Sequence, residues 1–159
     1  MNILVVSGSL PFHNVGGMEN VAWDVAMGLA ALGHRIHVLT TQLPEGRDFP
    51  RKSAPHDLLT VQFLPGTPPG LYSRQWWRAS RDAFDVLRGR FYPDVIVSIS
   101  AGAFSILPLL NGIPSVMQVH GTSLGEFFSK IRSAKPVAIA TALKNLWHVP
   151  SDLSMYRKF

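Results

Sequence analysis

The residues whose types could carry chemistry lie in polar segments that follow short apolar runs. Gly16 and Gly17 stand next to each other, just before a helix-like segment whose first turn contains Glu19. Glycines let backbone N–H groups come close to a ligand, and a helix N-terminus favours negative charge, so this loop predicts an anion-binding site. The alternative is a flexible loop before an acidic helix start, since a glutamate stabilises a helix N-terminus in any case.

His120 ends a later apolar run and is the second candidate. A neutral imidazole at the carboxyl end of a strand can hydrogen-bond a sugar hydroxyl, and a protonated one can oppose phosphate charge. Gly121 beside it permits a tight turn. A histidine in a loop can equally be solvated or bonded for structural reasons, so the residue type alone leaves both roles open.

Several kinds of site are excluded by the sequence. The chain has no cysteine, so neither a disulfide framework nor a thiolate metal site can form. Residues 8–11 lack the G-x-G-x-x-G spacing, which argues against a nicotinamide dehydrogenase. The chain contains no Asp-x-Asp, and its histidines, His13 included, show no metal-ligand spacing. We therefore expect no metal and no cofactor.

The apolar segments alternate between strand-like and helix-like patterns, which is typical of a parallel sheet covered by helices on both faces. The right-handed crossover rule then favours the strand order 3-2-1-4-5, with the first strand in the centre. In this fold the loop after the central strand lies where ligands bind. The expected strands are 2–7, 35–41, 58–64, 94–98 and 114–120, and the expected helices are 19–32, 73–91, 103–110, 124–131 and 137–147.

Apolar residues at helical spacing predict which sides of the first two helices are buried. For the first helix they are Val21, Val25, Leu29 and Leu32. For the second they are Trp77, Phe84, Leu87 and Phe91.

The second helix carries arginines on its other side. Together with the net charge of +5, they suggest peripheral contact with anionic lipid headgroups or with a lipid-linked acceptor. Interleaved Asp82 and Asp85 also fit an ordinary solvated face, so both interpretations stay open. No nucleic-acid-binding module accompanies the charge, so no nucleic-acid partner is expected. The arginines are Arg74, Arg78, Arg81 and Arg88.

Short motifs in this order resemble the N-terminal domain of the family 4 retaining glycosyltransferases, which have the GT-B fold. They run from Asn2 to Glu126 and are weak singly but specific together. The matching segments are 2–6, 16–19, 32–34, 37–41, 93–97, 113–114 and 119–122.

The resemblance implies a role for each matching residue. Gly16 and Gly17 would face the donor diphosphate, with Gly121 and Thr122 also on the donor side. His120 would approach the donor sugar as the catalytic residue. The acceptor side would be formed by His13 and Glu19. The reaction would be transfer of a sugar from a nucleotide-sugar donor to a saccharide or lipid-linked acceptor, without a metal, in polysaccharide or glycolipid assembly.

We accordingly expect residues 1–159 to form one Rossmann-like domain, the N-terminal half of a GT-B enzyme. The apolar fifth strand would be an edge that a further strand covers, so a C-terminal nucleotide-sugar domain is expected after Phe159, and the chain alone is expected to be inactive. No signal peptide or run of roughly 20 apolar residues is present, so we expect a cytoplasmic protein, peripheral at most on the inner membrane face. The alternatives are a flavodoxin-like phosphate-binding domain and a protein-interaction domain.

Overall fold

The computed structural model describes residues 1–13, 16–47, 49, 57–119, 153–154 and 157–159. The chain divides into two compact units, Met1–Gln118 and Val119–Phe159. The sheet and the helices that cover it belong to the first unit, to which the following description applies. The helices expected over 124–131 and 137–147 lie outside the described residues.

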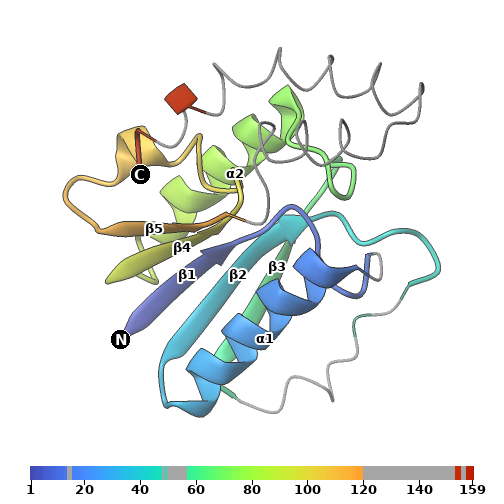
Figure 1. Cartoon of the computed structure of the whole chain (residues 1–159), viewed down its shortest axis with the longest axis horizontal. Helices are drawn as coiled ribbons and strands as arrows, with labels where there is room; N and C mark the ends of the chain where they lie inside the picture. The colour runs from blue at the N-terminus through green and yellow to red at the C-terminus, as the bar shows by residue number, and fades with distance from the viewer. Residues whose placement is uncertain (14–15, 48, 50–56, 120–152, 155–156) are drawn as a thin grey trace, which may run out of the picture. The chain divides into compact units, whose positions relative to one another are not determined.

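The first unit is built on a five-stranded sheet of order β3-β2-β1-β4-β5, in which every neighbouring pair is parallel. This confirms the predicted topology, with β1 in the centre (Figure 1). Each strand lies within a residue or two of its expected position, because each is a short apolar run bounded by polar or turn-forming residues. The strands are Asn2–Val6 (β1), Arg35–Thr41 (β2), Leu59–Leu64 (β3), Val95–Ile99 (β4) and Ser115–Gln118 (β5).

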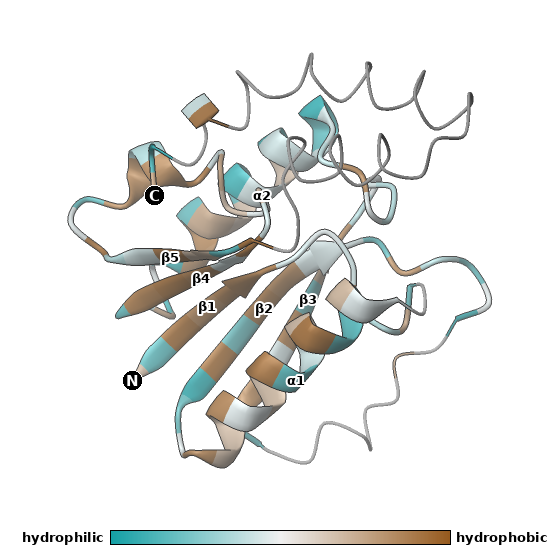
Figure 2. Ribbon diagram, in the orientation of Figure 1, coloured by the Kyte–Doolittle hydropathy of each residue, from teal (hydrophilic) through white to brown (hydrophobic). Residues whose placement is uncertain are grey.

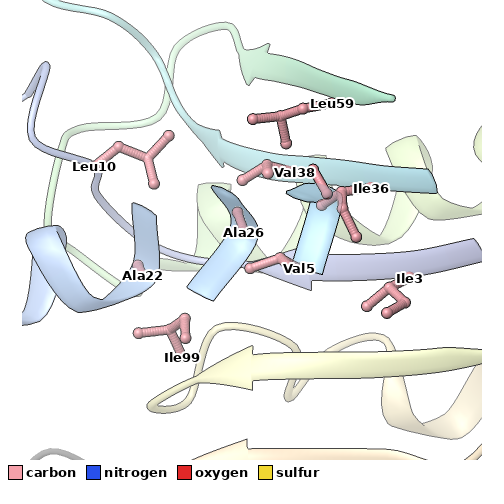
Figure 3. Close-up of a cluster of buried hydrophobic side chains, with 10 residues drawn as sticks. Ile3, Val5, Leu10, Ala22, Ala26, Ile36, Val38, Leu59 and Ile99 are labelled. Atoms are coloured by element: carbon pink, nitrogen blue, oxygen red, sulfur yellow. The ribbon is translucent and has the colours of Figure 1, made fainter. Parts of the chain in front are cut away.

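Helix α1, Gly17–Ala31, covers one face of the sheet. Between α1 and the sheet lies a cluster of buried aliphatic side chains, which Figure 3 shows in close-up. Alternate residues of the central strands supply it, as the two-residue period of a strand requires. Its members include Ile3, Val5, Ile36, Val38 and Leu59 from the strands and Ala22, Ala26 and Ala30 from the helix.

The buried stripe of α1 differs from the one that the apolar pattern predicted. The fully buried residues are Ala22, Ala26 and Ala30, whereas Leu32 is 74% exposed. Small side chains let the helix approach the sheet closely, and the larger residues Val21, Val25 and Leu29 then flank the contact, half-buried. The prediction of a Val-Leu face was therefore wrong by one position along the helix.

Helix α2, Arg74–Leu87, covers the opposite face. It begins after Ser73, whose hydroxyl accepts a hydrogen bond from the Trp76 N–H at 3.2 Å, the usual arrangement of an N-cap serine. Figure 2 shows hydrophobic residues along β1 and β4 and hydrophilic ones recurring along α2. The prediction was right for Phe84 and Leu87, and for Phe91, which is buried just beyond the end of the helix, but it named Trp77, which is half-buried, in place of Trp76. The buried residues of the helix are Trp76, Ser80, Phe84 and Leu87.

The helix predicted over 103–110 is not formed. The chain makes successive turns there and only a short 3-10 helix, Leu107–Leu109. Pro108 lacks a backbone N–H and cannot take part in an α-helical hydrogen-bond ladder, which explains the difference. The segment instead remains tied to β4, since the Ala103 N–H donates to the Ser98 hydroxyl at 2.9 Å.

Candidate functional site

The loops that leave the carboxyl ends of β1 to β4 gather at one edge of the sheet (Figure 1). One carbonyl of the loop after β1 contacts two neighbouring segments of the chain. The Gly8 carbonyl accepts hydrogen bonds from the Thr41 hydroxyl at 2.7 Å and from the Gly70 N–H at 3.0 Å. The loops that follow β1, β2 and β3 are therefore held together, although they lie far apart in the sequence.

Tyr72 fills the crevice between the carboxyl ends of β1 and β4, where a doubly wound sheet commonly takes its ligand. Its hydroxyl donates to the Ile99 carbonyl at 2.8 Å. Its ring covers Gly8 so closely that a Cβ on that glycine would lie 2.8 Å from the tyrosine Cε1. Burial raises the pKa of Tyr72 to about 12, so the phenol stays neutral and protonated.

The sequence offered no clear sign of the role of Tyr72. It stands two residues after the Gly70 turn, in a proline-rich segment that the pattern identified only as a structure breaker. Its ring also stacks on Trp77 with centroids 5.6 Å apart, which connects the crevice to α2.

His13 is placed in the β1 loop, but its ring is buried and both of its nitrogens are engaged by backbone groups. Nδ1 accepts from the Leu10 N–H at 2.9 Å, which assigns the proton to Nε2 and lets Nε2 donate to the Thr41 carbonyl at 2.9 Å. Burial lowers the pKa of His13 below its ordinary value of 6.5. In this arrangement the imidazole joins the β1 loop to β2 and has no free nitrogen for a ligand.

Gly16 and Gly17 lie at the N-terminus of α1, as expected, with Gly16 as the N-cap and Gly17 as the first helical residue. Glu19 folds back so far that a Cβ on Gly16 would collide with its carboxylate. That carboxylate also accepts from the Ser9 hydroxyl at 2.8 Å. Gly17 is exposed, and its Cβ position has open space within 4 Å, so it is the more accessible of the two glycines.

The turn after β4 reaches the same edge through a close contact with β1. A Cβ on Gly102 would lie 2.5 Å from the Val6 carbonyl oxygen, so only glycine fits there. The Gly102 carbonyl accepts from the Trp76 indole N–H at 3.1 Å. This contact sets the position of the β4 turn beside the β1 loop.

His120, Gly121 and Thr122 lie outside the described residues, so their placement relative to the glycine loop stays a prediction. Strand β5, which precedes them in sequence, ends at Gln118, whose carbonyl accepts from the Ser100 N–H at 2.9 Å. Val116 is 57% exposed, and within the part of the chain that the structure describes no strand pairs with the outer edge of β5.

The arginines of α2 are exposed, as predicted for a charged face. One of them, Arg88, pairs with Asp85 at 3.1 Å across one helical turn. No helix among the described residues is long and apolar enough to cross a bilayer. The same residues contain no group of three acidic, histidine or cysteine side chains that could hold a metal. The other exposed arginines are Arg74, Arg78 and Arg81.

Two solved structures share this fold. Sucrose-phosphate synthase from Thermosynechococcus elongatus superposes with a TM-score of 0.56 at 14% identity, over 92% of this chain and 39% of the synthase. The apo UGT2 of Phytolacca americana superposes with a TM-score of 0.50 at 14% identity, over 83% of this chain and 32% of that protein. At such identities the likeness shows the fold alone, and this chain spans well under half of either protein.

The sequence-based comparisons point the same way. No curated protein matches the sequence. The family model described as Glycosyltransferase Family 4 matches residues 15–153, which is most of the chain and includes the glycine loop, α1 and β2 to β5. With the parallel 3-2-1-4-5 sheet, this confirms the predicted fold and family. The chain belongs to Glycosyltransferase Family 4 and has the fold of the N-terminal domain of a GT-B glycosyltransferase.

Proposed function

We propose that this chain is the acceptor-side domain of a retaining glycosyltransferase that takes a sugar from a nucleotide-sugar donor. The observation that carries the proposal is the family match over residues 15–153. The acceptor is a saccharide or a lipid-linked molecule, the transfer needs no metal or cofactor, and a C-terminal domain supplies the nucleotide site. Residues 1–159 alone would provide half of the cleft and no turnover, because positioning and charge stabilisation need both halves.

The donor diphosphate would meet the N-terminus of α1. Gly17 is exposed there, and the first N–H groups of a helix attract negative charge. Gly16 lies under the Glu19 carboxylate, which repels an anion, so the proposed contact for the phosphate falls mainly on Gly17. Gly121 and Thr122 would complete the donor side, and His120 would approach the transferred sugar.

Glu19 would face the acceptor, whose hydroxyl can donate a hydrogen bond to the carboxylate. His13 would act on the acceptor side only by positioning, because backbone groups already engage both of its ring nitrogens. A flavodoxin-like site in the crevice beyond β1 is disfavoured, because the Tyr72 ring occupies that space.

The test of the proposal is donor turnover by the full-length protein and its His120→Ala variant. With a panel of nucleotide sugars, release of the nucleoside diphosphate should identify the donor. The variant should then lose about 10²- to 10³-fold in kcat, which is typical of removing one group that stabilises transition-state charge. The 159-residue chain by itself should release none.

The matched control is His34→Ala, which should leave kcat unchanged. His34 is half-buried and follows the C-terminal end of α1, whereas the glycine loop lies at the N-terminal end of that helix. Circular dichroism and Tm must show that both variants fold. Turnover by a folded His120→Ala variant at the rate of the original protein would refute the catalytic role of His120. Inversion at the anomeric carbon, read from the NMR coupling of the product, would refute retention.

Peripheral membrane contact is a second, separable proposal. The face of α2 that carries Arg74, Arg78 and Arg81 is exposed, and the chain is basic overall. Sedimentation with vesicles should rise with their content of phosphatidylglycerol and fall with added salt, since clustered arginines bind anionic headgroups electrostatically. Replacement of these three arginines by glutamine should abolish the effect, and unchanged sedimentation would contradict it.

A further inference from the structure

A pocket of about 290 Å³ lies between the chain segments that leave β2 and β3. Its volume is just below the range of roughly 300–1,000 Å³ that is typical of small-molecule sites. One wall is formed by residues 42–44, which come directly after β2 in the sequence. The other wall is the turn after β3, residues 66–69. The lining residues are Gln42, Leu43, Pro44, Gly66, Thr67, Pro68 and Pro69.

The two walls are joined by hydrogen bonds. The Gln42 N–H donates to the Thr67 hydroxyl at 3.0 Å, and the Thr67 hydroxyl donates in turn to the Leu64 carbonyl at 2.7 Å. The Gln42 side-chain carbonyl accepts from the Gly66 N–H. Gly66 has a φ of +72°, which favours glycine and shapes the turn at the rim. The pocket is thus a built feature of the fold.

The same hydrogen bonds leave little for a polar ligand. The Thr67 hydroxyl and the Gln42 side-chain carbonyl already have partners within the fold, and the prolines carry no N–H. Leucine and proline side chains dominate the remaining surface, so the pocket suits hydrocarbon better than a sugar ring.

The pocket is connected to the candidate site by the turn that forms its second wall. Two residues beyond Pro68, the Gly70 N–H donates to the Gly8 carbonyl in the β1 loop at 3.0 Å. The Leu71 N–H donates to the Pro68 carbonyl at 3.4 Å, and the Leu71 side chain is 59% exposed. Arg74 and Arg78 follow in the first turns of α2, both exposed. An apolar pocket, an exposed leucine and cations thus follow one another along a short stretch of chain.

We propose that this pocket binds the hydrocarbon portion of an amphiphilic acceptor, whose polar head then extends toward the β1 loop. The inference rests on the proposed glycosyltransferase function and narrows the acceptor class to glycolipid-type molecules. Burial of the hydrocarbon supplies the affinity, since each buried methylene group is favourable on transfer from water.

The experiment compares two glycosides that differ only in the apolar group: octyl β-D-glucoside below its critical micelle concentration, and methyl β-D-glucoside. Both are titrated into the full-length protein while the amide NMR signals are followed. The octyl compound should bind at least about ten-fold more tightly, the effect of burying about two methylene groups. Its largest shifts should fall on the amides of Gln42, Leu43, Gly66 and Thr67.

Leu43→Glu, which introduces a charge into the apolar wall, should remove the ten-fold preference. Leu43→Ala is a milder second variant, for use if the glutamate variant does not fold. It should reduce the preference for the octyl glycoside. The matched control is Leu32→Glu at the exposed end of α1, which should leave the preference unchanged. Equal binding of the two glycosides would overturn the proposal, as would octyl binding that survives the Leu43 variants or maps to other amides.

Donor turnover is measured on the same samples, so the two proposals can fail separately. Turnover without a preference for the octyl glycoside refutes the pocket assignment and leaves the transferase function intact. A preference that depends on Leu43 in a protein that turns over no nucleotide sugar supports an apolar site and refutes the proposed reaction.

Discussion

Replacement of Trp76 by alanine is expected to lower the free energy of unfolding by about 3–5 kcal/mol, as is typical for a fully buried tryptophan. The side chain is wholly inaccessible and lies between α2 and the turn after β4. The substitution would leave a large cavity and would also deprive the Gly102 carbonyl of its 3.1 Å hydrogen bond. Urea denaturation followed by circular dichroism measures the change.

Trp76→Phe separates the two contributions. It keeps most of the apolar volume but removes the indole N–H, so the expected loss is about 1–3 kcal/mol, the cost of a buried carbonyl without a partner. The control is Val86→Ala on the same helix, where the side chain is 68% exposed and the change should stay within about 0.5 kcal/mol. A Trp76→Ala loss no larger than that of Val86→Ala would contradict the assigned packing.

Gly102→Ala is expected to cost about 3 kcal/mol, because the added methyl group meets backbone atoms that cannot rotate away. Its Cβ would lie 2.5 Å from the Val6 carbonyl oxygen and 3.1 Å from that of Ile99. To relieve the collision, the β4 turn must move away from β1 and disturb the neighbouring β1 loop. Chemical denaturation gives the stability, and the donor-turnover assay that tests the proposed function reports the effect on the proposed site.

The control for this substitution is Gly28→Ala. Gly28 is exposed in α1, its Cβ position has open space within 4 Å, and alanine is the better helix former, so a gain of up to about 1 kcal/mol is expected. Opposite signs for the two glycine variants would support the close contact of β1 and β4. A Gly102→Ala protein as stable as the original would show that the turn after β4 does not approach β1 as described.

The sequence pattern predicted the order of strands and helices more reliably than it predicted which face of a helix is buried. The periodicity of α1 predicted a Val-Leu stripe, but the sheet contacts an alanine stripe, because the distance of closest approach depends on which side chains the facing strands present. The conformation of residues 103–110, where a helix was expected, likewise depends on local contacts. Pro108 and the hydrogen bond from Ala103 to Ser98 hold that segment in turns beside β4.

By itself, the sequence determined the order of strands and helices, the parallel 3-2-1-4-5 sheet and the glycine pair at the start of α1. These follow from local apolar runs, turn residues and the handedness of crossovers, which neighbouring residues encode. Tertiary structure alone decided that Tyr72 fills the central crevice, that His13 has no free nitrogen and that Glu19 covers Gly16. Each depends on how a side chain meets another loop or folds back over its own, and such three-dimensional contacts leave no periodic signal in the chain.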